Sequence, residues 1–396
     1  MKLNTLFLYF YLCFLLLFAI VSASFWLDFR NNTPIPKFLL TLLLDLFGVC
    51  VCFFNINIFG VNRGIALALI WILLTPFTLY IAHTSFLLSD IVSVVLWPFV
   101  FITSYILVRS NNSNFYKMQT TFVWIMGVML LFFLYSKHSK TIYDLEQSNM
   151  IFFPLLTLPW LMSLKRNVIK ILFLLLLFIM ILYSLKRSAI IVGFLCFAPY
   201  IFSFLSRYRN KFFGVLLSFS LVLALGVSFY AINQASGNII TERFSAMGED
   251  EGSGRLIIYG LVFDMQSHSS DMEWIFGHGH YAVRQDSIWD MSAHNDFLEV
   301  LYDYGIIVLI LYIFFIVNII RQLFVLRKRN SWLYGAYFAS LILFFVQSMV
   351  SHLILYASNF IFLVAFWGAV QAIIDTENNR MRYDNLDNNT RCSYGK

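Results

Sequence analysis

Residues 168–206 have the sequence VIKILFLLLLFIMILYSLKRSAIIVGFLCFAPYIFSFLS, and this stretch decides the fold class. It contains two apolar runs, 168–184 and 188–206, which are separated by the adjacent cations Lys186 and Arg187. A helix needs roughly 20 apolar residues to cross the hydrocarbon core of a bilayer. Two such runs joined by a short basic turn are typical of a helical hairpin in a membrane.

The same pattern recurs along most of the chain. Of its 396 residues, 60% are hydrophobic and 12% are charged, whereas soluble domains carry about 25% charged residues. The other apolar stretches lie at 6–26, 38–56, 64–83, 87–108, 120–135, 150–163, 213–232, 297–320, 333–350 and 353–374. We therefore predict an all-α polytopic membrane protein with about twelve spans, or about eleven if the stretch interrupted by Pro154 and Pro159 does not cross.

The positive charges indicate the orientation, because cytoplasmic loops retain Lys and Arg. Most of the 27 Lys and Arg residues fall on the side that twelve spans assign to both termini. Spans one to nine then occupy residues 1–232, and the last three occupy 297–374. Residues 233–296 form one long outer loop, and long connections are usually functional or disordered. We expect the polar tail, residues 375–396, to be a mobile cytoplasmic end.

Charge and cysteine content exclude several classes of function. The net charge of +6 comes from short loops between helices and forms no long basic block, so we expect no nucleic acid partner. The five cysteines are scattered without paired spacing, which favours neither a disulfide framework nor a zinc site.

Two candidate sites on the outer face carry cations. Lys186 and Arg187 lie where a charge is costly unless it meets an anion or reaches lipid headgroups, and snorkelling to lipid phosphates is the alternative explanation. The second site is a glycine-rich turn, 252–254, that leads into Arg255 and Tyr259, four residues apart on one helical face. A guanidinium and backbone N–H groups at a helix start favour an anion. An ordinary interfacial helix remains the alternative.

The third candidate site is rich in histidine. Gly277-His278-Gly279-His280 is followed by Ser292-Ala293-His294-Asn295, where the loop enters the helix at 297. We expect Ser292 to cap this helix, which places His294 in its first turn, where the dipole disfavours the imidazolium. A neutral imidazole can accept a proton. A purely structural role is the alternative for His294.

A metal site is a further alternative for the same histidines. His278, His280 and His294 could act as ligands, with oxygen ligands from Asp286, Asp290 and Asp296. Their spacing matches no metal signature, so we predict no metal at this site.

Together, these features resemble the O-antigen ligase and polymerase superfamily of bacterial envelope glycan assembly. The resemblance runs from about Ser184 to the helix after the long loop. Its most specific part is His294-Asn295-x-x-Leu298-x-x-Leu301-x-x-Tyr304-Gly305. The family often has Ser-Arg where Lys186-Arg187 stands here, and a second glycine soon after Gly305, so the branch is left open.

The resemblance implies an inverting glycosyltransferase of the bacterial inner membrane that uses no cofactor and no metal. It would transfer glycan from a polyprenyl diphosphate carrier to an acceptor sugar hydroxyl on the periplasmic side. Arg187 and Arg255, assisted by Lys186, would hold the diphosphate. His294 would be the general base, oriented by Asn295 or Asp296. The remaining candidates for substrate binding are Arg284, Tyr259, His278, His280 and Asn295.

Three functional alternatives remain. The acidic, tyrosine-rich stretch 298–305 favours a polymerase, which joins lipid-linked repeat units, over a ligase, which moves finished chains onto lipid A core. A flippase would carry polar residues within many spans, and Asp45 and Asp90 are the main ones here. A structural scaffold would tolerate loss of Arg255. A flippase and a chain-length regulator are the protein partners that this pathway suggests.

Overall fold

The computed structural model describes residues 3–27, 34–58, 62–82, 88–138, 149–165, 167–206, 211–245, 254–288, 290–355 and 357–393, and every regular element among them is a helix. Seven helices are long and apolar enough to cross a membrane: α1 (Leu3–Leu27), α2 (Ile35–Phe54), α3 (Arg63–Ile81), α4 (Leu88–Ser110), α5 (Ser113–His138), α15 (Asp296–Lys328) and α17 (Ala357–Ser393). The expectation of an all-α membrane protein is therefore confirmed at this level.

Further apolar helices complete the bundle: α6 (Phe152–Leu156), α7 (Leu158–Met162), α8 (Asn167–Tyr183), α9 (Arg187–Ser206), α10 (Lys211–Ala235) and α16 (Tyr334–Val350). Each stretch predicted to span contains a helix, while the total of about twelve spans stays a prediction. The stretch 150–163 is divided at Thr157 into α6 and α7, which contain Pro154 and Pro159. Proline interrupts the hydrogen-bond ladder of a helix, which explains this break.

The centre of the bundle is formed by α4 and α17, which pack extensively on each other. Their rings Trp97 and Trp367 are fully buried, and the Trp97 ring lies 4.9 Å from that of Phe315 in α15. The outward faces of other helices expose large apolar side chains, for example Leu73 at 75% and Trp124 at 70%. Such a surface suits lipid, which solvates apolar groups.

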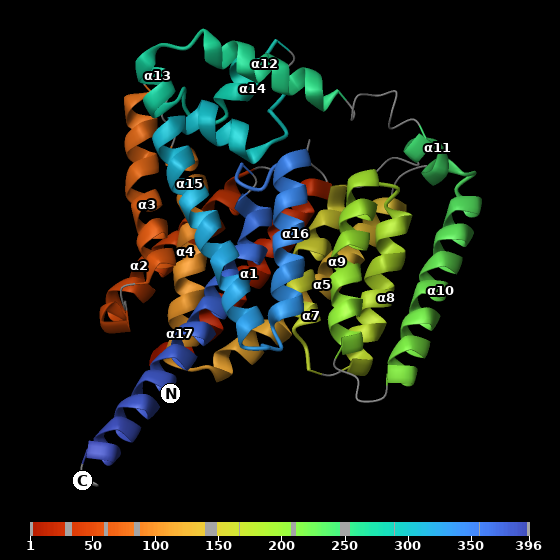
Figure 1. Ribbon diagram of the computed structural model, residues 1–396. Coiled ribbons are helices and arrows are strands. Elements are labelled where there is room, and N and C mark those ends of the chain that lie inside the picture. The colour runs from red at the N-terminus through yellow and green to blue at the C-terminus, as the bar shows by residue number, and fades with distance from the viewer. Residues whose placement is uncertain are drawn as a thin grey trace.

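Four short helices from the long loop lie across one end of the bundle, whereas the marks for both chain ends lie at the other (Figure 1). They are α11 (Ile239–Ser245), α12 (Arg255–Ser267), α13 (Asp271–Phe276) and α14 (Ala282–Asp286). We call α12 to α14 and the connection 290–295 the cap. The cap contacts α15 and α3, and the Phe276 ring lies 6.2 Å from that of Phe77. The loop thus folds against the bundle, although Gly252, Ser253 and Trp289 lie outside the described residues.

The cap is joined to the bundle at a break in α15. Gly305 has φ 80° and ψ 175°, which interrupts the helix. The carbonyls of Tyr302 and Asp303 instead accept hydrogen bonds from the N–H groups of His278 and Gly279, both at 2.9 Å. A Cβ atom on Gly305 would overlap the carbonyl of Ile275. Only glycine fits a backbone of this conformation at this separation.

The polar tail begins as a continuation of α17. Composition predicted a mobile end from Asp375, but α17 continues through Ser393. The first residues of this extension bind the bundle: Tyr105 donates to the Asp375 carboxylate at 3.0 Å, and Arg329 pairs with Glu377 at 2.9 Å. Composition does not register such contacts from other helices, and the mobile cytoplasmic end stays a prediction.

Substitution Gly305→Ala tests the junction between cap and bundle. The added Cβ must displace the 275–277 backbone, so we expect the free energy of unfolding to fall by about 2 kcal/mol or more. Thermal unfolding of the detergent-solubilised protein measures this as a lower midpoint. The matched control is Gly260→Ala in α12, where a Cβ meets open space and the midpoint should hold or rise. Equal midpoints for the two variants would contradict the junction.

Candidate active site

The first turns of α15 bear three buried carboxyl groups, and each binds a different part of the polypeptide. Asp296 accepts hydrogen bonds from the N–H groups of Leu353 and Ile354, at 2.9 and 3.2 Å. Ser348 donates to its second oxygen at 2.7 Å. This carboxyl therefore fixes the connection between α16 and α17 against the start of α15.

Asp303, two turns further along α15, binds the cap. Its two oxygens accept from the N–H groups of Tyr281 and Val283, at 3.0 and 3.2 Å. Next to it, the Tyr304 hydroxyl lies 2.5 Å from Nδ1 of His280. His280 is buried, and burial lowers its pKa to about 4. These contacts hold the glycine- and histidine-rich turn in place, and burial leaves His280 neutral at physiological pH.

The helix cap differs from the one predicted. The side chain of Asn295 accepts hydrogen bonds from the N–H groups of Phe297 and Leu298, at 3.0 and 3.3 Å. Asn295 is thus the N-cap of α15, and the assignment of Ser292 to this role was wrong. Both residue types favour N-caps, so local sequence does not choose between them. The Asn295 side chain is engaged in capping, while its proposed contact with substrate stays a prediction.

His294 precedes this cap in a left-handed conformation, with φ 51°. Its ring stacks on that of His352, with centroids 4.6 Å apart and planes at 26°. The pKa of His294 is lowered by burial, and further by the positive charges of Arg255 and Lys186. His294 is therefore a neutral imidazole at physiological pH, as the sequence predicted, but its expected place in the first turn was wrong, because it precedes the N-cap Asn295. Burial and the two cations lower the pKa instead of the helix dipole.

Arg255 and Tyr259 reach the same place, as their spacing indicated. Arg255 is the first residue of α12, and its Nε donates to the carbonyl of Val350 at 3.0 Å. The Tyr259 hydroxyl donates to the carbonyl of Met349. Both side chains therefore bind the C-terminal end of α16, where carbonyl groups lack helical partners. The guanidinium lies near enough to His294 for its charge to act there.

Lys186 and Arg187 stand where the hairpin turns. Leu185 has φ 56°, Lys186 follows it, and Arg187 is the first residue of α9. α9 packs on α16, and the C-terminal end of α16 leads into the connection that contains His352. The charge of Lys186 acts on His294. The structure thus brings Lys186, Arg255 and His294 together, while the role of Arg187 in the same site stays a prediction.

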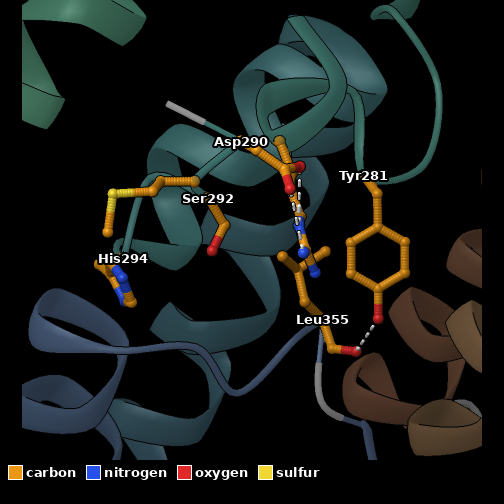
Figure 2. Close-up of a pocket in the computed structure, with 7 residues that line it drawn as sticks. Tyr281, Asp290, Ser292, His294 and Leu355 are labelled. Carbon is orange, nitrogen blue, oxygen red and sulfur yellow. Dashed lines mark hydrogen bonds and ion pairs between the residues drawn. The ribbon is translucent and has the colours of Figure 1, made fainter. Parts of the chain in front are cut away.

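A pocket of about 180 Å³ opens beside His294 (Figure 2). It is lined by Tyr281, Arg284, Asp290, Met291, Ser292, His294 and Leu355. Arg284 pairs with Asp290 at 3.2 Å, and the Tyr281 hydroxyl donates to the carbonyl of Leu355 at 3.3 Å. Sites for whole ligands usually measure about 300 Å³ or more, so this pocket has room for a part of a large substrate.

The three histidines considered as metal ligands have separate partners. His278 stacks on Tyr302 at 4.1 Å, and its Nε2 lies 2.8 Å from the Ser269 hydroxyl. His280 binds Tyr304, and His294 stacks on His352. Within the described ranges, no three His, Cys, Asp or Glu side chains are grouped as metal ligands would be.

Sequence reasoning missed His352. It lies 58 positions beyond His294, in the connection after α16, and only 3% of its surface is exposed. Its Nε2 lies 2.8 Å from the Ser292 hydroxyl, and its Nδ1 lies 3.7 Å from Glu299. No motif signals this residue, because its neighbours in the site come from a distant part of the sequence.

Comparison with known proteins identifies part of the chain. Residues 172–313 match the family model described as O-antigen ligase. Among curated proteins, none matches the chain. The matched region starts in α8 and ends within α15, so it includes Lys186, Arg187, Arg255 and His294 but not His352. Residues 172–313 therefore form an O-antigen ligase-like domain, consistent with the O-antigen polymerase and ligase superfamily that the sequence resembles.

Proposed function

We propose that this protein transfers a glycan from a polyprenyl diphosphate carrier to a hydroxyl of an acceptor sugar. The observation that carries this proposal is a neutral histidine, His294, beside a pocket and under the positive charges of Arg255 and Lys186. These residues belong to the O-antigen ligase-like region. A base and cations together suit a reaction in which a proton leaves the nucleophile while negative charge gathers on the leaving group.

The proposed reaction is a single displacement. The acceptor oxygen forms a bond to the anomeric carbon, and His294 takes the proton of that hydroxyl. The bond from the anomeric carbon to the phosphate oxygen breaks, and the diphosphate departs with the electron pair. Arg255 and Arg187, assisted by Lys186, stabilise this charge. Attack opposite the leaving group inverts the anomeric centre.

The acceptor is proposed to be a second lipid-linked repeat unit, which makes the protein a polymerase of O-antigen or a related exopolysaccharide. The acidic, tyrosine-rich stretch 298–305 suggested this choice, but in the structure Glu299, Asp303 and Tyr304 serve to hold the cap. The second candidate is a ligase that moves the chain onto lipid A core, and the match to the family described as O-antigen ligase does not distinguish the two. Polymerase and ligase would use the same polyprenyl diphosphate-linked donor and the same displacement, and they differ in the acceptor.

The same proposal sets the orientation in the membrane. Both chain ends lie opposite the cap (Figure 1), which supports the proposal that one membrane face receives both termini and the other receives the site. We propose the bacterial inner membrane, with the termini in the cytoplasm and the cap in the periplasm, where flipped carrier lipids are available. A flippase and a chain-length regulator are the proposed partners.

Gene deletion with complementation tests the function. We expect wild type to restore a ladder of surface lipopolysaccharide, whereas Arg187→Ala, Arg255→Ala or His294→Ala at matched membrane levels leaves a single-repeat band. The control variant is Lys117→Gln, at the opposite end of the bundle, which should restore the ladder. Bare core with polymer still on the carrier would make the protein a ligase. An unchanged ladder after deletion of the gene would refute both the polymerase and the ligase function.

The pH dependence of transfer tests His294 as the base. Its lowered pKa keeps the imidazole neutral as pH falls, so the acid limb of kcat/KM should lie below the ordinary histidine value of about 6.5. In Lys186→Gln, one of the two cations that oppose protonation is lost. The limb should then move to higher pH, while Lys117→Gln leaves it in place. A limb that stays fixed in Lys186→Gln would argue against His294.

A further inference from the structure

His352 occupies an unusual position relative to His294. It belongs to the connection between α16 and α17, outside the O-antigen ligase-like region, yet its ring stacks directly on that of His294. The side chain is almost fully buried. A ring-to-ring contact of 4.6 Å between two separate segments fixes the plane of each ring with respect to the other.

His352 is itself held from several directions. Its Nε2 is bound to the Ser292 hydroxyl at 2.8 Å, and its Nδ1 faces the Glu299 carboxyl at 3.7 Å. The N–H groups of the next two residues, Leu353 and Ile354, donate to Asp296. A side chain that is buried, bound at Nε2, stacked on a second ring and fixed through the neighbouring backbone has little rotational freedom. It therefore serves as a rigid support for a ring packed against it.

The expected supports for His294 are engaged elsewhere. Asn295 caps α15 through Phe297 and Leu298, and Asp296 binds Ser348 and the 353–354 backbone. We propose that His352 is the positioning residue that holds the imidazole of His294 toward the acceptor hydroxyl. The proposal rests on the function proposed above, in which His294 is the base.

The charges around the pair favour a base of this kind. Arg255 from α12 and Lys186 from the turn before α9 act on His294, Glu299 from α15 faces His352, and Arg284 and Asp290 line the adjoining pocket. Burial, together with His294 and Arg255, lowers the pKa of His352 to about 3. His352 thus stays neutral when His294 takes a proton, so its ring adds no second positive charge against that step.

Chemical modification tests the support without any assay of transfer. Diethylpyrocarbonate reacts with neutral, accessible imidazoles, and peptide mass spectrometry reports the rate at each histidine of the purified full chain as pH varies. In His352→Ala we expect His294 to react several-fold faster and with an apparent pKa closer to the ordinary value, because burial is lost. In His352→Phe, which retains a ring, the modification rate and the apparent pKa of His294 should both stay near their wild-type values. The exposed His268 is the internal reference.

An unchanged rate and apparent pKa of His294 in His352→Ala, with His268 also unchanged, would overturn the proposal. Thermal unfolding of each variant shows whether the fold is retained. If the alanine variant does not fold, His352→Gln replaces it, since glutamine can still bond Ser292 but offers no ring. Faster modification of His294 in the glutamine variant supports the proposal, and a wild-type rate overturns it.

Transfer kinetics separate this proposal from the function on which it rests. With carrier-linked oligosaccharide extracted from the deletion strain, a misplaced base should lower kcat about 10- to 100-fold in His352→Ala with little change in KM. His352→Phe should recover part of kcat. Full activity in His352→Ala with an inactive His294→Ala would overturn the positioning role alone. Full activity in His294→Ala would overturn the role of His294 as the base, and absence of transfer by the wild type would overturn the proposed function, while the modification rates still report on the support.

Discussion

The rest of the site depends on one break in a helix. Because Gly305 leaves helical geometry, the carbonyls of Tyr302 and Asp303 are available to the N–H groups of His278 and Gly279. Backbone groups at membrane depth must find partners within the protein, and this exchange satisfies both segments at once. The cap is thereby attached to a helix of the bundle through main-chain hydrogen bonds, which do not depend on the side chains of the cap. Arg255 and several residues of the pocket belong to the cap, so this attachment fixes where they lie relative to the bundle.

A second layer of order comes from the acidic face of α15. Asp296, Glu299 and Asp303 are spaced by three and four residues, so their side chains project from one face of the helix. Asp296 binds the connection after α16, Glu299 accepts from the N–H of Ala293 at 2.6 Å, and Asp303 binds the start of α14. One helical face thus gathers the connection before α15, the start of α14 and the distant connection after α16. Their convergence brings the rings of His294 and His352 into contact.

Hydropathy predicted the helices well, because lipid imposes length and polarity on each span. Local spacing also predicted that Arg255 and Tyr259 share one helical face, and both bind the end of α16. The neutral state of His294 was predicted too, although from a helix dipole rather than from burial and nearby cations. The sequence could not indicate that Asn295 rather than Ser292 caps α15, because both are suitable cap residues. Nor could it place His352, whose role follows from long-range packing. The acidic stretch was noticed but assigned to acceptor choice, since the hydrogen bonds that it makes are visible only in three dimensions.

The spacing of the three acidic residues also limits how this protein can change in length. Each residue advances an α-helix by about 100° and 1.5 Å. One residue inserted between Asp296 and Asp303 would therefore turn the Asp303 carboxyl away from the cap. At outward-facing positions of the same stretch, one apolar side chain can replace another without changing the directions in which the three carboxyl groups point. The first two turns of α15 therefore tolerate changes of side chain far better than changes of length, and alignments of related chains should be free of gaps there.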